Sequence, residues 1–188
     1  MNKIKQVSLF FRVIFQILFI TFPLVLIFGW ATNPDSVVLM HGMINMNFIP
    51  AAYRANSAMG GIMHPLSGSE KLLGFGISCI PLAINLFIIY SLIKLFKLYE
   101  KGEIFSIENV RRIRNVGWGL LVGQIVGPIS DGFLGVALTW HNPPHHRYAS
   151  ITLDQTNLGV LFIALMVILI SWIMAEGCKL REEQQLTI

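Results

Sequence analysis

The chain has 188 residues, of which 54% are hydrophobic and only 13% are charged, and its formal net charge at pH 7 is +4. Soluble domains carry about twice this share of charged residues, so the composition argues against an ordinary soluble enzyme. The positive excess is small, and its distribution along the chain is the one that membrane topology explains. We therefore do not expect nucleic acid as a partner.

Four long apolar runs divide the chain into spans and connections. The spans cover residues 8–30, 72–95, 116–140 and 158–178, and each is long enough to cross a hydrocarbon core of about 30 Å as a helix. We predict an all-α membrane protein with four transmembrane helices in an up-down bundle, folded as a single domain over residues 1–188. The connections are an outer loop over 31–70, an inner hairpin loop over 96–115 and an outer loop over 141–157.

Basic residues mark one side of the lipid bilayer. Eleven of the 14 Lys and Arg lie at the start of the first span, between the second and third spans, or after the fourth. They are Lys3, Lys5, Arg12, Lys94, Lys97, Lys101, Arg111, Arg112, Arg114, Lys179 and Arg181. Because the positively charged side of a membrane protein faces the cytoplasm, we expect both the N and C termini to be cytoplasmic.

The inner hairpin loop carries signals for the end of one helix and the start of the next. Gly102 is a natural helix end, since glycine adopts the left-handed conformation at low cost. Ser106 is a good N-cap, and Glu108 falls in the following turn, where a negative charge is favourable. We therefore predict a helical hairpin whose arginines face lipid headgroups or a partner.

Gly119, Gly123 and Gly127 recur at intervals of four residues in the third span. This spacing places the three glycines on one helix face, where a second helix can approach closely. The approaching helix belongs either to the same bundle or to a second copy of the chain, and the pattern leaves both alternatives open.

Two segments of the chain carry a family resemblance. Residues 98–118 read LYEKGEIFSIENVRRIRNVGW, and residues 180–188 read LREEQQLTI. Both resemble segments of the domain of unknown function 2975 family (DUF2975) of bacteria. The resemblance implies a multi-pass protein of the bacterial inner (cytoplasmic) membrane with a similar size and layout. It implies no activity, because none is established for the family.

Methionine and histidine are concentrated in the two outer loops. The candidate metal ligands there are Met40, His41, Met43, Met46, His64, His141, His145 and His146. Thioethers favour Cu(I), whereas imidazole suits copper, zinc, iron and nickel, so copper is the cofactor that this mixture indicates. The alternative is structural, because methionine also fills apolar gaps and the first outer loop is apolar enough to fold as a lid.

Asp131 is an ionisable residue inside the third span. At its predicted depth in the bilayer, an ionisable side chain is energetically unfavourable, so it is expected to have a functional role or a polar partner. The candidate polar partners within the predicted spans are Gln16, Asn85 and Gln124. Pro128, between Gly127 and Gly132, is expected to break or kink the helix there, as in transporter binding sites. The alternative is that Asp131 hydrogen-bonds to a neighbouring helix and joins the bundle.

No catalytic motif supports an enzyme, and no catalytic residue is assigned. The leading interpretation is a small, non-enzymatic accessory or sensor protein that acts through helix contacts with a membrane-protein partner or with itself. The alternatives are metal (copper) binding by the outer methionines and histidines, and proton-linked transport of a small solute through Asp131.

Overall fold

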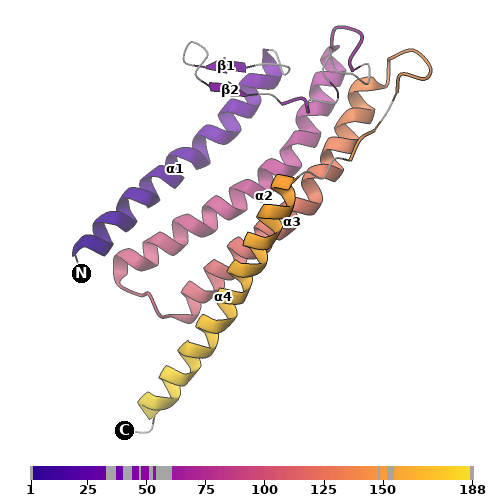
Figure 1. The fold of residues 1–188 in the computed structure, drawn as a ribbon. Helices are drawn as coiled ribbons and strands as arrows, with labels where there is room; N and C mark the ends of the chain where they lie inside the picture. The colour runs from indigo at the N-terminus through magenta and orange to yellow at the C-terminus, as the bar shows by residue number, and fades with distance from the viewer. Residues whose placement is uncertain are drawn as a thin grey trace. The chain divides into compact units, whose positions relative to one another are not determined.

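The computed structural model describes residues 2–32, 37–39, 44–46, 48–50, 53, 61–147, 149–151 and 155–186. Four helices account for most of them, namely α1 (Asn2–Ala31), α2 (Gly68–Lys101), α3 (Ile107–Thr139) and α4 (Gln155–Leu186) (Figure 1). All four are long and apolar enough to cross a membrane, which confirms the predicted fold class. The chain is therefore a multi-pass membrane protein.

Large apolar side chains remain exposed along the whole length of these helices. Ile20 on α1, Leu72 on α2, Phe162 on α4 and Ile173 on α4 each leave more than 60% of their surface uncovered. Water would make such exposure unfavourable at about 25 cal/mol per Å² of apolar surface. Lipid tails, by contrast, are as apolar as these side chains, so the exposed helix surfaces suit contact with a bilayer.

The chain divides into two compact units, and each helix except α4 contributes to both. The hairpin unit contains Met1–Ile20, Ile84–Gln124 and Asp154–Ile188, and the loop unit contains Thr21–Ala83 and Ile125–Leu153. In α1, α2 and α3 the division falls close to a proline, namely Pro23, Pro81 and Pro128. Proline removes one helical hydrogen bond, so each of these helices lacks one backbone bond close to the division.

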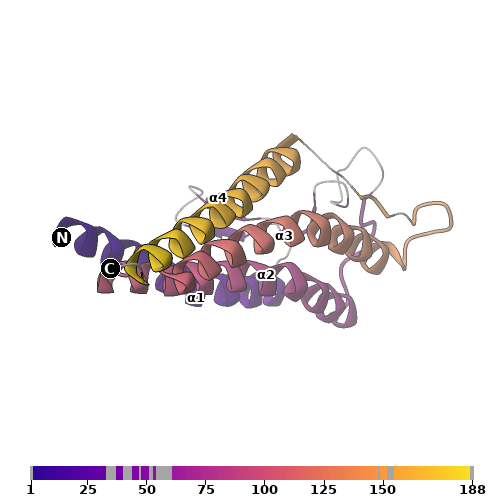
Figure 2. The same ribbon diagram turned by 90° about the horizontal axis from the view of Figure 1, so that it is seen from below.

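The hairpin unit is organised by the short turn between α2 and α3. Gly102, directly after α2, has a φ of 82°, and the Glu103 amide donates to the Leu98 carbonyl across 3.0 Å. Ser106 precedes α3, and its Oγ accepts a hydrogen bond of 3.2 Å from the Asn109 amide. Both features confirm the predicted helix end and N-cap. The turn places α2 and α3 side by side in this unit (Figure 2).

An aromatic stack and an ion pair attach α1 to α2 in the hairpin unit. The ring of Phe96 lies 5.3 Å from that of Phe11 and 5.7 Å from that of Phe15, with interplanar angles of 16° and 22°. One turn along, Arg12 Nε lies 3.0 Å from a carboxylate oxygen of Glu100. These contacts hold the first half of α1 against the last turns of α2.

The loop unit has its own hydrophobic core. Trp30 packs so closely on α2 that a Cβ at Gly74 would lie 2.1 Å from its ring. Tyr53 is 1% exposed, and a Cβ at Gly135 would lie 2.1 Å from its ring. Its hydroxyl donates a hydrogen bond to the Ser150 carbonyl across 2.9 Å. The core therefore joins α1, α2 and α3 to segments that follow α1 and α3.

Two departures from the predicted fold are local. The first connection contains a short antiparallel ribbon of β1 (Val37–Leu39) and β2 (Ile44–Met46), with Val38 opposite Asn45. The segment around Pro128 was predicted to break or kink the third helix, and the break does not occur, since α3 continues through it; the kink stays a prediction. A proline removes a single backbone hydrogen bond, and neighbouring turns of a membrane helix can maintain the rest.

Candidate metal centre

Glu70 lies in the first turn of α2 and closes its N-terminus. Its Oε2 accepts a hydrogen bond of 2.8 Å from the Ser67 amide, and the Glu70 amide donates to Ser67 Oγ across 3.3 Å. This reciprocal pair is a capping box, in which each side chain satisfies a backbone donor of the other residue. Glu70 is 2% exposed, so the cap holds a carboxylate in a buried position with Oε1 left over.

His141 lies two residues after the end of α3 and meets that remaining oxygen. Its Nδ1 is 2.7 Å from Glu70 Oε1, and because a carboxylate only accepts, the ring nitrogen donates. The side chain of His141 is 66% exposed, so its other ring nitrogen is free to reach water. The contact joins the end of α3 to the start of α2.

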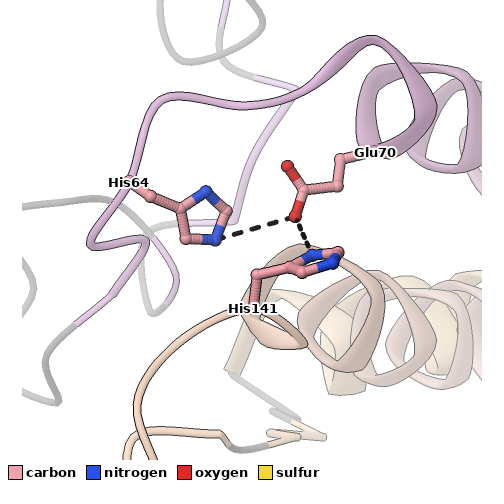
Figure 3. Close-up of side chains that lie close together, drawn as sticks. All are labelled: His64, Glu70 and His141. Atoms are coloured by element: carbon pink, nitrogen blue, oxygen red, sulfur yellow. Dashed lines mark hydrogen bonds and ion pairs between the residues drawn. The ribbon is translucent and has the colours of Figure 1, made fainter.

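His64, in the segment before α2, approaches the same oxygen from another direction (Figure 3). Its Nδ1 lies 3.2 Å from the Pro65 carbonyl, which can only accept, so Nδ1 carries the proton of the neutral ring. Its Nε2 then presents a lone pair, lies 3.6 Å from Glu70 Oε1, and is buried without a hydrogen-bond partner among the described residues. In the neutral ring two electron-rich atoms therefore face each other, whereas in the protonated ring Nε2–H and the Glu70 carboxylate form an ion pair.

Asn142 fixes the spacing of these side chains. It is 1% exposed, its Nδ2 donates to the Gly61 and His146 carbonyls at 2.9 Å each, and its Oδ1 accepts from the Met63 amide at 3.2 Å. The residue before it in the chain is His141, and the residue after Met63 is His64. One buried amide therefore aligns the segment that carries each histidine.

The three side chains form a two-histidine, one-carboxylate donor set. One nitrogen from each ring and one oxygen of Glu70 all lie within 4.8 Å of one another. Zinc ligands lie about 2.0–2.2 Å from the ion, which separates neighbouring donors by roughly 3.3 Å in a tetrahedron. The His64–Glu70 distance already fits. The His141–Glu70 distance must widen by roughly half an ångström, which the exposed His141 ring permits.

Sequence reasoning identified two of these three residues. Among the other predicted ligands, His145 and His146 are exposed and lie outside the cluster, and His145 has a φ of 74°. Met40, His41 and Met43 lie outside the described residues, and Met46 is described only as part of β2. Copper ligation by thioethers therefore remains a prediction.

Glu70 is the residue that the sequence interpretation missed. The signal was present as Ser67-Gly68-Ser69-Glu70 ahead of an apolar run, because this spacing predicts a capping box at a helix start. A buried acid at a helix start, six residues after one of the loop histidines, would have drawn attention to His64. Its contact with His141 spans 71 residues, and no local pattern predicts such a contact.

Asp131 and its three predicted polar partners fall in different compact units. Asp131 is exposed on α3, and among the described residues of its own unit it makes no hydrogen bond or ion pair. It belongs to the loop unit, whereas Gln16, Asn85 and Gln124 belong to the hairpin unit. The polar cluster of these four residues therefore stays a prediction.

Two of the three glycines in the α3 strip pack against another helix of the same chain. A Cβ at Gly119 would lie 2.6 Å from Ile88 of α2, and one at Gly123 would lie 3.6 Å from Ile84, whereas one at Gly127 would meet nothing within 4 Å. Gly117, which the strip did not include, lies against α4, where an added Cβ would be 2.7 Å from Ile168. Close packing at Gly119 therefore involves the chain's own α2.

Comparison with known proteins gives a family and no activity. The model of the family described as "Protein of unknown function (DUF2975)" matches residues 62–188, a stretch that includes His64, Glu70 and His141. No curated protein and no solved structure matches the chain. The family match covers about two thirds of the sequence and confirms the resemblance of residues 98–118 and 180–188. The chain belongs to the DUF2975 family.

Proposed function

We propose that this membrane protein reversibly binds one divalent transition-metal ion, best matched by Zn²⁺, and acts as a non-enzymatic sensor or accessory protein. The ligands are His64 Nε2, Glu70 Oε1 and His141 Nδ1. His141 shifts its ring proton to the exposed Nε2 when its Nδ1 takes the ion. The bound ion draws together the segment before α2, the first turn of α2 and the end of α3.

The orientation of the His64 ring is the observation that carries this proposal. Its Nδ1–H is committed to the Pro65 carbonyl, as the second nitrogen of a metal-bound histidine usually is. Its Nε2 is buried, has no hydrogen-bond partner among the described residues and faces Glu70. In the neutral ring this lone pair faces a carboxylate, and either a proton on Nε2 or a metal ion between the two atoms removes the repulsion.

The chemistry of the donors supports zinc over copper. Two imidazole nitrogens and one glutamate oxygen, with a position left for water, are a known ligand set for zinc and also suit ferrous iron. Cu(I) prefers thioethers and thiolates, and the described cluster contains neither. Copper is therefore the competing ion that a binding experiment must include.

The distribution of charge supports an orientation for the site. All 11 of the basic residues assigned to the inner side belong to the hairpin unit, whereas His64, Glu70 and His141 belong to the loop unit. With the basic residues on the cytoplasmic side, both termini would be cytoplasmic, and the connections that carry the three ligands would lie outside. The ion would then be taken from outside the cytoplasm.

A metal titration of the purified full-length protein tests the proposal. The protein is stripped with a chelator in detergent and titrated with Zn²⁺ and, under reducing conditions, with Cu(I). We expect about one Zn²⁺ per chain and at least a tenfold weaker affinity in His64→Gln. The matched control is His146→Gln, which removes an exposed histidine of the loop unit outside the cluster and should bind zinc as the unaltered chain does.

Two outcomes would overturn the assignment. Equal zinc affinity in His64→Gln and His146→Gln would show that His64 is no ligand. Tighter binding of Cu(I) that survives loss of His64 would move the site to the methionine-containing part of the first connection.

A further inference from the structure

A second site lies in the hairpin unit, at the turn between α2 and α3. A pocket of about 180 Å³ is lined by Lys94, Lys97, Leu98, Lys101, Glu108 and Arg112. The four α2 residues are spaced by three, one and three positions, so they share one helix face. The other two residues come from the first two turns of α3, which the Gly102 turn and the Ser106 cap bring opposite that face.

The lining carries a strong excess of positive charge. Three lysines and one arginine face a single carboxylate, Glu108, and that carboxylate is already engaged. It accepts a hydrogen bond from Arg112 Nη2 and lies 3.5 Å from Arg111 Nη1. The neighbouring acid Glu100 is paired with Arg12. The pocket therefore has three more positive than negative side chains.

Arg112 provides a second reason to expect an anion. Its Nε is buried and has no hydrogen-bond partner within the described part of the chain. A buried donor without an acceptor costs about 1–3 kcal/mol, and more when the group is charged. A bound anion would balance this positive charge and would also meet the positive end of the α3 dipole.

The position of the pocket indicates where the anion comes from. The pocket begins at Lys94, where the predicted apolar span of α2 ends, and faces the start of α3. The residues on either side of Ser106, Phe105 and Ile107, leave 67% and 45% of their surfaces exposed. Exposed apolar residues beside a cationic pocket at a helix end suit the interface of a bilayer, where phosphate headgroups meet acyl chains.

We propose that the pocket formed by Lys94, Lys97, Lys101 and Arg112 binds the phosphate of an anionic phospholipid headgroup. The lysines act as point charges, and Arg112 supplies directed N–H donors. The site rests on the geometry of the hairpin unit and is independent of the metal proposal. It would tie the α2–α3 turn to anionic lipid on the side of the membrane where the turn lies.

Lipid titration of the delipidated full-length protein in neutral detergent tests the site. Native mass spectrometry would compare short-chain phosphatidylglycerol, short-chain phosphatidylcholine and inorganic phosphate. We expect phosphatidylglycerol to bind about tenfold more tightly than phosphatidylcholine, and Lys97→Gln with Lys101→Gln to weaken it about tenfold. The charge-retaining pair Lys97→Arg and Lys101→Arg should keep most of the binding.

The matched control removes the same charge elsewhere in the hairpin unit. Arg114→Gln with Arg181→Gln alters two basic residues that do not line the pocket and should change phosphatidylglycerol affinity by less than about twofold. An equal loss in both pairs would show a diffuse charge effect and overturn the pocket. Binding of inorganic phosphate as tightly as phosphatidylglycerol would overturn the lipid as its source.

Discussion

His141 Nδ1 and Glu70 Oε1 lie 2.7 Å apart and connect the end of α3 to the first turn of α2. The same oxygen lies 3.6 Å from His64 Nε2. One carboxylate oxygen thus serves as the meeting point for two rings from separate segments. The side chains of all three residues belong to the loop unit, whose core contains Trp30, Tyr53 and Leu138.

Glu70→Gln separates the capping function of Glu70 from ligand binding. Glutamine at this position still accepts from the Ser67 amide, because either Glu or Gln completes a capping box. The neutral amide is a much weaker metal ligand than a carboxylate, so we expect zinc affinity to fall at least tenfold. Thermal unfolding of the metal-free protein should occur at a somewhat lower temperature, because the neutral side chain loses the charge-assisted contact with His141. Retention of full zinc affinity by this variant would exclude Glu70 as a ligand.

Asn142→Ala tests the alignment of the two histidine segments. It removes three hydrogen bonds and leaves the His146 carbonyl and the Met63 amide without the partner that Asn142 provides. Each unsatisfied buried group costs about 1–3 kcal/mol, so the metal-free protein should unfold at a lower temperature. Zinc affinity should fall about tenfold although no ligand is lost. Unaltered zinc affinity in a correctly folded variant would refute the alignment role.

Acidification should weaken zinc binding. A protonated imidazole has no lone pair for a metal ion, so protons compete with zinc at His64 and His141. Between about pH 7.5 and about pH 5.5 we expect the affinity to fall by more than tenfold, as measured by zinc titration at fixed ionic strength. His146→Gln should show the same dependence. An affinity that stays constant or rises as the pH falls would contradict histidine ligation.

Gly117→Leu should destabilise the hairpin unit, whereas Gly127→Leu should be tolerated. A Cβ at Gly117 would lie 2.7 Å from Ile168 Cγ1 and 3.1 Å from the Ile168 backbone nitrogen, and the backbone atom cannot move aside easily. Such overpacking costs about 1–3 kcal/mol. The added atom at Gly127 would meet nothing within 4 Å. Thermal unfolding in detergent compares the two, and equal midpoints would show that α3 and α4 do not pack at Gly117.

Local features of the fold could be predicted from the sequence, and long-range contacts could not. The four apolar runs predict the helices because a membrane imposes a minimum length on them. Gly102 and Ser106 predict the α2–α3 turn because backbone geometry requires such residues there. The β1–β2 ribbon was missed because each strand has only three residues, too few to show an alternating pattern.

The candidate site shows the same division. His64 and His141 were selected by residue type, together with His145 and His146, because residue type alone cannot rank histidines that share a loop. Burial of Glu70 and the ring orientation of His64 distinguish the cluster from its neighbours, and both depend on tertiary contacts. Among the glycines, the four-residue repeat detected Gly119 but omitted Gly117, because α4 approaches a different face of α3.

The two oxygens of Glu70 have separate tasks, since Oε2 closes the first turn of α2 while Oε1 faces the rings. The positive end of a helix dipole stabilises a negative charge at this position whether or not an ion is present. Without a metal ion, the negative charge of the Glu70 carboxylate is therefore still stabilised by the N-terminus of α2. If the proposed ion binds there, its arrival or departure changes the net charge at the turn where a membrane-crossing segment begins.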